Sequence, residues 1–303
     1  MTFPTEVTIT GPFRSPAQML ADQVVDGHAS IHDGDAAASL GLTGAPIEGP
    51  THFSQFDPLG FTLWGKRWFE DGCISSHFRT MVVEGELVQA SMITTGDGRA
   101  RVEAHKADMT PVLVGSASVG PEHPQTALEA RLAAQGEPGE LFVIDRLHVG
   151  MANADDEPVR MSFADRNGGS YPFSLDEKLA TITEPHPWYT AAGAADSPWG
   201  RPIIPIEMIS VLANKSGRGW PVRSPAFGLF LDLEVRLLGE PLFVDHPYRI
   251  SREVVGLGQS RRTESYWTRT TLSDSDTGRA AAIVLLHSGV FKDSYPGYPK
   301  ERL

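Results

Sequence analysis

The chain has 303 residues, of which 41% are hydrophobic and 21% are charged, so it can build a packed core and is not disordered. Its net charge of −12, from 26 Lys and Arg against 38 Asp and Glu, argues against a nucleic-acid-binding protein. The same charge makes a strongly anionic ligand unexpected, unless a local cluster of arginines holds it.

The single cysteine, Cys73, excludes an intramolecular disulfide and fits a reducing compartment, where we expect it to fill a small space near a strand start. The first residues, Met1 to Pro4, show no basic segment followed by an apolar run. No apolar stretch reaches the roughly 20 residues that span a bilayer. We therefore expect a cytoplasmic protein with no membrane partner.

The first half of the chain predicts a short helix, a central helix and then strands. Small residues favour a helix over 36–40, for which Asp33 or Asp35 is a suitable N-cap. Apolar residues at spacings of three and four predict the central helix over 50–69, which Pro58 would interrupt. Apolar residues in 76–94 and 99–119 predict the strands of this half.

A linker and a second, similar half follow. Residues 122–140 read as a linker that carries a short helix over 126–134. In the second half we expect a small-residue helix at 190–195 and a central helix at 205–216. The predicted strands of this half are Phe227–Leu238, His246–Val255, Arg261–Leu272 and Arg279–Phe291.

Three short patterns recur in the same order at offsets near half the chain length. G-x-P-I begins at Gly44 and Gly200, G-E at Gly85 and Gly239, and G-x-x-R spans 96–99 and 258–261. Each half alone would leave exposed sheet edges, and two halves paired edge to edge remove them. The sequence thus predicts an α+β duplication, with one half at 1–121 and the other at 141–303.

The residues around each G-x-P-I resemble those of the MaoC-like or R-specific enoyl-CoA hydratase family of hotdog proteins. That family has D-x-N-P-x-H, then an alanine and a glycine, then P-I and a His-Gly pair. In this chain 184–189 occupies the D-x-N-P-x-H slot of the second half, with Pro187 identical. In the first half His32 stands near the motif histidine, and Glu48-Gly49 replaces His-Gly. The resemblance covers roughly 5–120 and 140–292 and implies a tandem double hotdog, with a long central helix wrapped by an antiparallel sheet in each half.

The resemblance also implies an activity, a substrate class and partners. In the family an Asp and a His act as a base and acid pair that adds water to, or removes it from, an acyl thioester. A backbone N–H at the start of the central helix holds the thioester oxygen. The chain is therefore expected to be a hydratase or dehydratase, a lyase, with a small-molecule substrate such as an acyl-CoA, no added cofactor and a homodimeric state.

Two groups of candidate site residues follow. The catalytic candidates are Asp26, His28 and His32. The substrate-binding candidates are Glu48, Gly49, His52, Glu184, His186 and Tyr189. Both motifs depart from the family pattern. Tyr189 replaces the histidine and is a poor base near neutral pH, and Gly27 stands five residues before His32 where the acid belongs, so that Asp26 needs a bulge to reach its place.

Other readings of these residues stay open. A hotdog thioesterase would use Glu48 or Glu207 to activate water against the thioester carbonyl. A non-catalytic ligand-binding protein would also explain why both motifs are altered. The loop that holds Asp26, His28 and His32 could simply cap the helix that follows. The histidines show no zinc-type spacing, so we expect no metal, and no glycine-rich phosphate loop is present.

Overall fold

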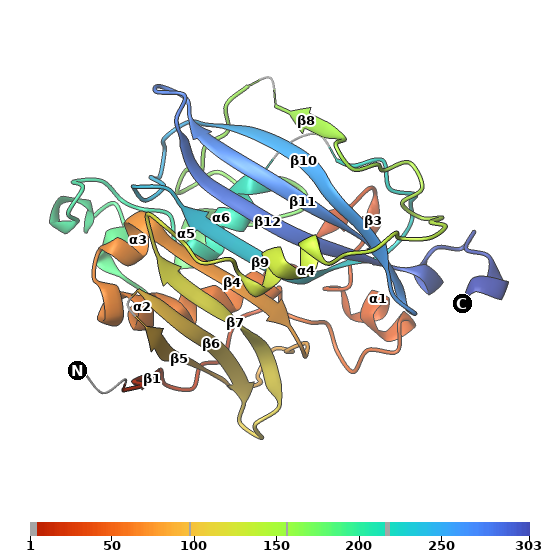
Figure 1. Cartoon of the computed structure of the whole chain (residues 1–303), viewed down its shortest axis with the longest axis horizontal. Coiled ribbons are helices and arrows are strands. Elements are labelled where there is room, and N and C mark those ends of the chain that lie inside the picture. The colour runs from red at the N-terminus through yellow and green to blue at the C-terminus, as the bar shows by residue number, and fades with distance from the viewer. Residues whose placement is uncertain (1–4, 97, 156, 216–218) are drawn as a thin grey trace.

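One antiparallel sheet joins the two halves of the chain. The computed structural model describes residues 5–96, 98–155, 157–215 and 219–303, and within them ten strands form this sheet (Figure 1). Residues 1–4, position 97 of the G-x-x-R pattern and position 216 of the predicted second helix lie outside the described residues. The strands in chain order are β1 (Thr8–Thr10), β4 (Gly72–Phe78), β5 (Val88–Gly96), β6 (Arg99–Lys106), β7 (Pro111–Val119), β8 (Ala152–Ala154), β9 (Gly228–Leu237), β10 (Tyr248–Gln259), β11 (Thr263–Asp274) and β12 (Ala280–Phe291).

The two halves have the same strand order. Across the sheet the first half runs β5-β6-β7-β4 and the second runs β10-β11-β12-β9. In each half the strand after the central helix pairs with the last strand, and β1 or β8 extends the outer edge. This repeated topology confirms the duplication and the α+β double hotdog predicted from the sequence. The exact boundaries of the halves and the linker stay a prediction.

The halves meet where β4 and β9 pair along their length. Ile74 lies opposite Val235 and Ser76 lies opposite Leu233 in an antiparallel register. Each strand would be an open edge in an isolated half, so this pairing removes two edges at once. The linker helix α4 (Ala127–Ala133) begins at a capping box on Thr126 and lies in front of this seam (Figure 1).

The central helices differ from the long ones predicted. In the first half a 3-10 segment, η1 (Gly49–Phe56), leads into α2 (Asp57–Trp64), and α3 (Arg67–Asp71) follows after a break. The break lies at Gly65, whose φ of +61° glycine adopts readily. In the second half α6 (Ile206–Ala213) ends at its cap, Asn214.

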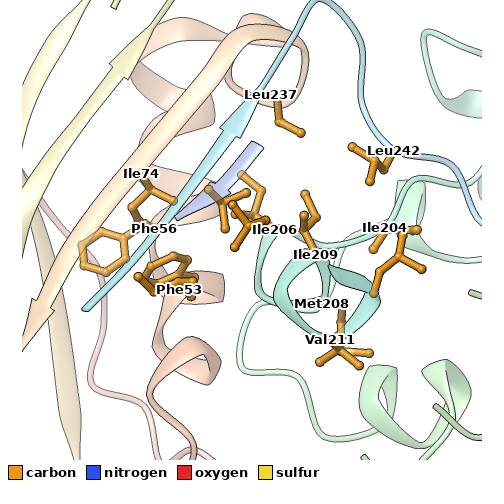
Figure 2. Packing of buried hydrophobic residues seen from close by; sticks show 14 of the residues in the cluster. Phe53, Phe56, Ile74, Ile204, Ile206, Met208, Ile209, Val211, Leu237 and Leu242 are labelled. Atoms are coloured by element: carbon orange, nitrogen blue, oxygen red, sulfur yellow. The ribbon is translucent and has the colours of Figure 1, made fainter. Parts of the chain in front are cut away.

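The central helices pack against each other between the halves. Figure 2 shows Phe53 and Phe56 of η1 beside Ile206 of α6, with Ile74 on β4 and Leu237 on β9 closing the same cluster. All five side chains are buried, and burying a side chain of this size contributes about 1.5–3 kcal/mol. Phe53 and Phe56, two of the apolar residues whose spacing predicted the helix, therefore lie at the contact between the two halves.

Smaller elements show which local signals were reliable. The helix α1 (Gly34–Ser39) begins at Asp33, whose Oδ1 accepts a hydrogen bond from the backbone of Ala36 over 2.9 Å, as its capping role predicts. The helix predicted at 190–195 was wrong, because this stretch forms turns and then the 3-10 segment η3 (Ala194–Asp196). There Gly193 lies so close to the carbonyl of Pro187 that a Cβ would meet that oxygen at 2.2 Å.

The remaining short elements lie in loops. They are the hairpin of β2 (Val24–Val25) and β3 (His28–Ala29), the helix α5 (Leu175–Leu179), and the 3-10 segments η2 (Pro187–Tyr189), η4 (Lys292–Ser294) and η5 (Lys300–Arg302). Cys73 is buried in β4, as expected of a small filler. In the described part of the chain, every helix is too short or too polar to cross a membrane.

Candidate functional site

A cavity of about 620 Å³ lies between the loops of the first half and the sheet of the second half. This volume falls in the range that holds small-molecule ligands. The first half contributes the loop from Gln23 to His32 and the start of η1, and the second half contributes β9, β11 and β12. The cavity also reaches Ala213 and Asn214, where α6 ends.

His32 is a neutral imidazole on the cavity wall. Its Nδ1 lies 2.6 Å from the carbonyl oxygen of Pro46, and because a carbonyl can only accept, Nδ1 carries the proton. Burial lowers the pKa of His32 below its usual value, although the bond to Pro46 opposes this shift. The unprotonated nitrogen is then Nε2, which can accept a proton at neutral pH.

Glu48 is a buried carboxyl group on the same wall. Burial raises its pKa to about 7, although the charge of Lys178 and a hydrogen bond from Tyr171 both oppose this shift. The hydroxyl of Tyr171 donates to Glu48 Oε1 over 3.0 Å. A carboxyl group with this pKa can donate a proton near neutral pH, which an exposed glutamate cannot do.

Gly49 opens η1 beside Glu48 and lines the cavity. A Cβ at this position would lie 2.8 Å from the ring of Phe78, so a larger residue here would have to displace that ring. The first N–H groups of a helical segment have no acceptor within that segment. The start of η1 can therefore hold a ligand oxygen, which is the role expected for Gly49.

His52 lies one turn further along η1 and also lines the cavity. Burial, together with the charges of Lys178 and Lys106, lowers its pKa to about 4. Gln55 Nε2 lies 3.4 Å from His52 Nδ1. His52 is therefore neutral over the physiological range and can offer a hydrogen bond but no charge.

Asp26 and His28 lie at the hairpin of β2 and β3. Asp26 and Gly27 have φ values of +50° and +83°, which make the two-residue turn between these strands, so no bulge moves Asp26 inward. Asp26 is exposed, and His28 Nδ1 lies 2.7 Å from the carbonyl of Ala29. Both residues line the cavity, and so does Glu48, which is the buried carboxyl group of the same lining.

Glu184, His186 and Tyr189 lie outside the residues that line this cavity. Glu184 accepts two hydrogen bonds from the guanidinium of Arg14, over 2.6 and 3.0 Å. The side chain of His186 caps η2. Tyr189 is buried and donates to Asp57 Oδ2 over 2.8 Å. The structure thus separates the second-half motif from the first-half one, and its substrate-binding role stays a prediction.

A buried ion pair between Lys178 and Glu207 lies near Glu48. Lys178 Nζ on α5 is 3.0 Å from Glu207 Oε1 on α6 and 3.4 Å from Thr51 Oγ1 on η1. Burial raises the pKa of Glu207, and Lys178 opposes the shift. Sequence reasoning missed Lys178 and Tyr171. The S-x-x-E pattern at Ser174 marks the start of α5, but no local pattern indicates that the lysine is buried.

Among the described residues, one group could hold a metal ion. Ligand atoms of His246, Asp274 and Asp276 lie within 4.8 Å of one another, outside the cavity lining; the two aspartates belong to the connection from β11 to β12, and His246 precedes β10. Asp274 Oδ1 already accepts hydrogen bonds from the backbones of Asp276 and Thr277 and from the Thr277 hydroxyl. These bonds form the turn, so they explain the position of Asp274 without a metal.

No family model matches this sequence, and no curated protein is similar to it at a significant level. Solved structures, however, are similar over almost the whole chain. A conserved hypothetical protein from Mycobacterium tuberculosis with a double hotdog fold is 11% identical, with a TM-score of 0.57 over 95% of this chain and 97% of that one.

Two dehydratases have the same architecture. A protein from Chloroflexus aurantiacus described as a MaoC domain dehydratase is 13% identical, with a TM-score of 0.55 over 95% of each chain. A MaoC-like dehydratase is 12% identical, with a TM-score of 0.51 over 94% of this chain and 97% of that one. At these identities the similarity shows the fold, and this chain has the double hotdog fold.

Proposed function

We propose that this chain, which has the double hotdog fold found in MaoC-like dehydratases, is itself a hydratase or dehydratase of an acyl thioester. One observation carries the proposal. The neutral imidazole of His32 and the carboxyl group of Glu48, whose pKa is about 7, line one cavity. Water addition to a double bond requires a base that takes a proton from water and an acid that donates a proton to the α-carbon.

The proposed roles follow from these proton affinities. His32 Nε2 takes a proton from water while the water oxygen bonds to the β-carbon. Glu48 donates its proton to the α-carbon as the double bond is lost. The first N–H groups of η1 at Gly49 hold the thioester oxygen, where negative charge develops. Dehydration follows the same steps in reverse, with Glu48 as the base.

The other candidate residues of the first half take no part in the proton transfers of this proposal. Asp26 and His28 lie at the hairpin beside the cavity, where they can contact the substrate. His52 is a neutral residue of η1 in the cavity wall. The substrate is expected to be a small-molecule thioester such as an acyl-CoA. The cytoplasmic location and the homodimer stay predictions.

Incubation with crotonyl-CoA and with saturated acyl-CoAs tests the proposal. Loss of the enoyl absorbance without free thiol supports hydration. Free thiol from saturated chains would instead identify a thioesterase, in which Glu48 activates water. Neither signal, together with tight binding of a thioester, would leave a ligand-binding protein and overturn the enzyme proposal.

His32→Asn is the sharpest variant, because asparagine can keep the hydrogen bond to Pro46 and removes the basic nitrogen. We expect kcat to fall about 100-fold or more with KM little changed, the scale of one acid or base group. His148, which is exposed on a loop, provides the control His148→Asn with unchanged activity. A parallel His28→Asn variant that loses more activity than His32→Asn would move the base to the hairpin.

A further inference from the structure

Asn214 forms the cap of α6 and lines the cavity. Its Nδ2 donates a hydrogen bond of 2.9 Å to the backbone carbonyl of Ser210, one turn earlier in the helix. A carbonyl oxygen can only accept, so this bond fixes which end of the side-chain amide carries the hydrogens. One hydrogen of Nδ2 is used in this bond, and the second is available to another acceptor.

The second acceptor is the hydroxyl oxygen of Tyr171. Burial and the neighbouring Glu48 raise the pKa of Tyr171 well above its usual value, and a hydrogen bond from the side chain of Asn214 opposes this shift. A hydrogen bond lowers the pKa of a tyrosine when the partner donates to the phenol oxygen, because it stabilises the ionised form. Tyr171 therefore accepts a hydrogen bond from Asn214 and must give its own proton to a different group.

The proton of Tyr171 points to one particular oxygen of Glu48. The hydroxyl donates to Oε1 over 3.0 Å. The other oxygen, Oε2, has no hydrogen-bond partner among the described residues and is not fully buried. Because Glu48 lines the cavity, Oε2 is the oxygen that is open to it. When Glu48 is protonated, Oε1 already faces a hydrogen, so the proton lies on Oε2.

A hydroxyl and a carboxyl group alone would not fix this arrangement. The hydrogen of a hydroxyl group rotates to suit its neighbours, so a protonated Glu48 could instead donate from Oε1 to Tyr171. Oε2 would then carry no proton. The donor from Asn214 already occupies the phenol oxygen and disfavours this reversal. It also polarises the hydroxyl, because hydrogen bonds in a chain strengthen one another by roughly 10–30% each.

We infer that Asn214 is a positioning residue, which acts through Tyr171 to keep the proton of Glu48 on Oε2, the oxygen open to the cavity. The placement of this proton rests on the hydrogen bonds alone, and its transfer to a substrate rests on the proposed function. The groups that act on the ionisation of Glu48 directly are Tyr171, Lys178 and Glu207, so Asn214 acts through one of them.

Infrared titration tests the placement without any reaction. The band of the protonated carboxyl group of Glu48 is identified by its loss in Glu48→Gln, and its pH dependence gives the pKa. Asn214→Leu should raise the pKa of Glu48 by about 0.5 unit, a fraction of one hydrogen bond, because Tyr171 becomes a weaker donor. In a Tyr171→Phe protein the same substitution should cause no further shift. Equal shifts in both backgrounds, or a shift in neither, would overturn the inference.

Hydration of crotonyl-CoA tests the consequence for turnover. In Asn214→Leu the maximal kcat should fall about 5-fold with KM little changed, the scale of one hydrogen bond, because the proton can then occupy either oxygen of Glu48. The alkaline limb of kcat should move to higher pH. Asn214→Gln keeps an amide donor and should recover part of the activity. A loss of kcat that is the same with and without the Tyr171 hydroxyl would show a structural role alone.

Further variants separate this role from folding. The φ of Asn214 is −98°, which leucine adopts without strain. If Asn214→Leu fails to fold, Asn214→Ser serves, since a hydroxyl can still bond to the carbonyl of Ser210 but has no second hydrogen for Tyr171. Gln259→Leu is the control. It removes an amide that donates to the carbonyl of Pro138 outside the cavity lining, and it should leave the pKa of Glu48 unchanged.

The outcomes also distinguish this inference from the proposed function. If the pKa of Glu48 responds to Asn214 only in the presence of the Tyr171 hydroxyl, but no unsaturated thioester is hydrated, the placement of the proton stands and the hydratase proposal fails. If crotonyl-CoA is hydrated and the pKa of Glu48 does not respond to Asn214, the hydratase stands and the inference fails.

Discussion

The hydroxyl of Tyr171 donates a hydrogen bond to Glu48 Oε1 over 3.0 Å and thereby links two residues that are 123 positions apart. This bond ties a loop of the second half to the start of the first central helix. It also lowers the pKa of Glu48 against the larger effect of burial. The proton affinity of the proposed acid, which lies in the first half, therefore depends on residues of the second half.

Tyr171→Phe removes this bond and should raise the pKa of Glu48 further above its ordinary value. Because Glu48 must be protonated to act as the acid, the alkaline limb of the hydration rate should move to higher pH. The variant should also lose about 1–3 kcal/mol of stability, since a buried oxygen loses its donor. The pH dependence of kcat measures the first effect, and urea unfolding measures the second.

Tyr298→Phe is the matched control. The hydroxyl of Tyr298 donates a hydrogen bond of 3.1 Å to Glu264 Oε1, and neither residue lines the cavity. It should lose similar stability without moving the pH profile. A profile that moves equally in both variants, or in neither, would contradict the role given to Tyr171.

Lys178→Met should destabilise the protein by about 3–5 kcal/mol, because it leaves Glu207 as a buried carboxylate without its ammonium partner. Adding Glu207→Met should recover much of the loss, since an apolar pair of similar volume avoids the desolvation of both charges. Urea unfolding of the single and double variants measures the coupling. The exposed pair of Lys66 and Glu70 is the comparison, and Lys66→Met should change stability by less than about 1 kcal/mol.

Asp57 makes the free energy of unfolding depend on pH, and because burial raises its pKa, the protein should be more stable at low pH than at neutral pH. Its pKa is raised to about 7, with hydrogen bonds from Trp68 and Tyr189 opposing the shift. The folded protein therefore binds more protons than the unfolded chain between about pH 4 and 7. The contribution of Asp57 to the free energy of unfolding is therefore complete below about pH 4 and is lost as the pH rises through about 7.

Asp57→Asn should remove this contribution, so the unfolding free energy of the variant should fall less steeply with rising pH. The difference between the two slopes should approach 1.4 kcal/mol per pH unit in this window. His52, with its pKa lowered to about 4, acts in the opposite direction in both proteins and cancels in the comparison. Identical slopes from pH 4 to 7 would show that Asp57 stays ionised.

Glu184→Gln tests whether the second-half motif carries chemistry. Glu184 is bonded to Arg14 outside the cavity lining, so turnover should stay almost unchanged. The cost in stability should be small because Arg14 is partly exposed. A loss of about 100-fold in kcat would instead place an acid or base group there and overturn the preference for the first half.

The sequence by itself determined the order of the elements and the duplication. Alternating apolar residues mark the strands of the second half, and capping residues such as Asp33 and Thr126 mark helix starts. These signals are local, because a strand or a helix start depends on residues a few positions apart. The repeated G-x-P-I and G-x-x-R patterns then indicated two equivalent halves, and His32, Glu48 and Gly49 were found through their place beside the first repeat.

Only the tertiary structure decided which of these residues meet and how strongly they hold their protons. Lys178 reaches Thr51 across 127 positions, and Asn214 meets Tyr171 only because α6 ends at the cavity. The sequence around Lys178 and Asn214 does not distinguish them from surface residues. Burial and pairing arise from contacts between distant segments, and they set the pKa of Glu48 and the direction of the hydrogen bond from Tyr171.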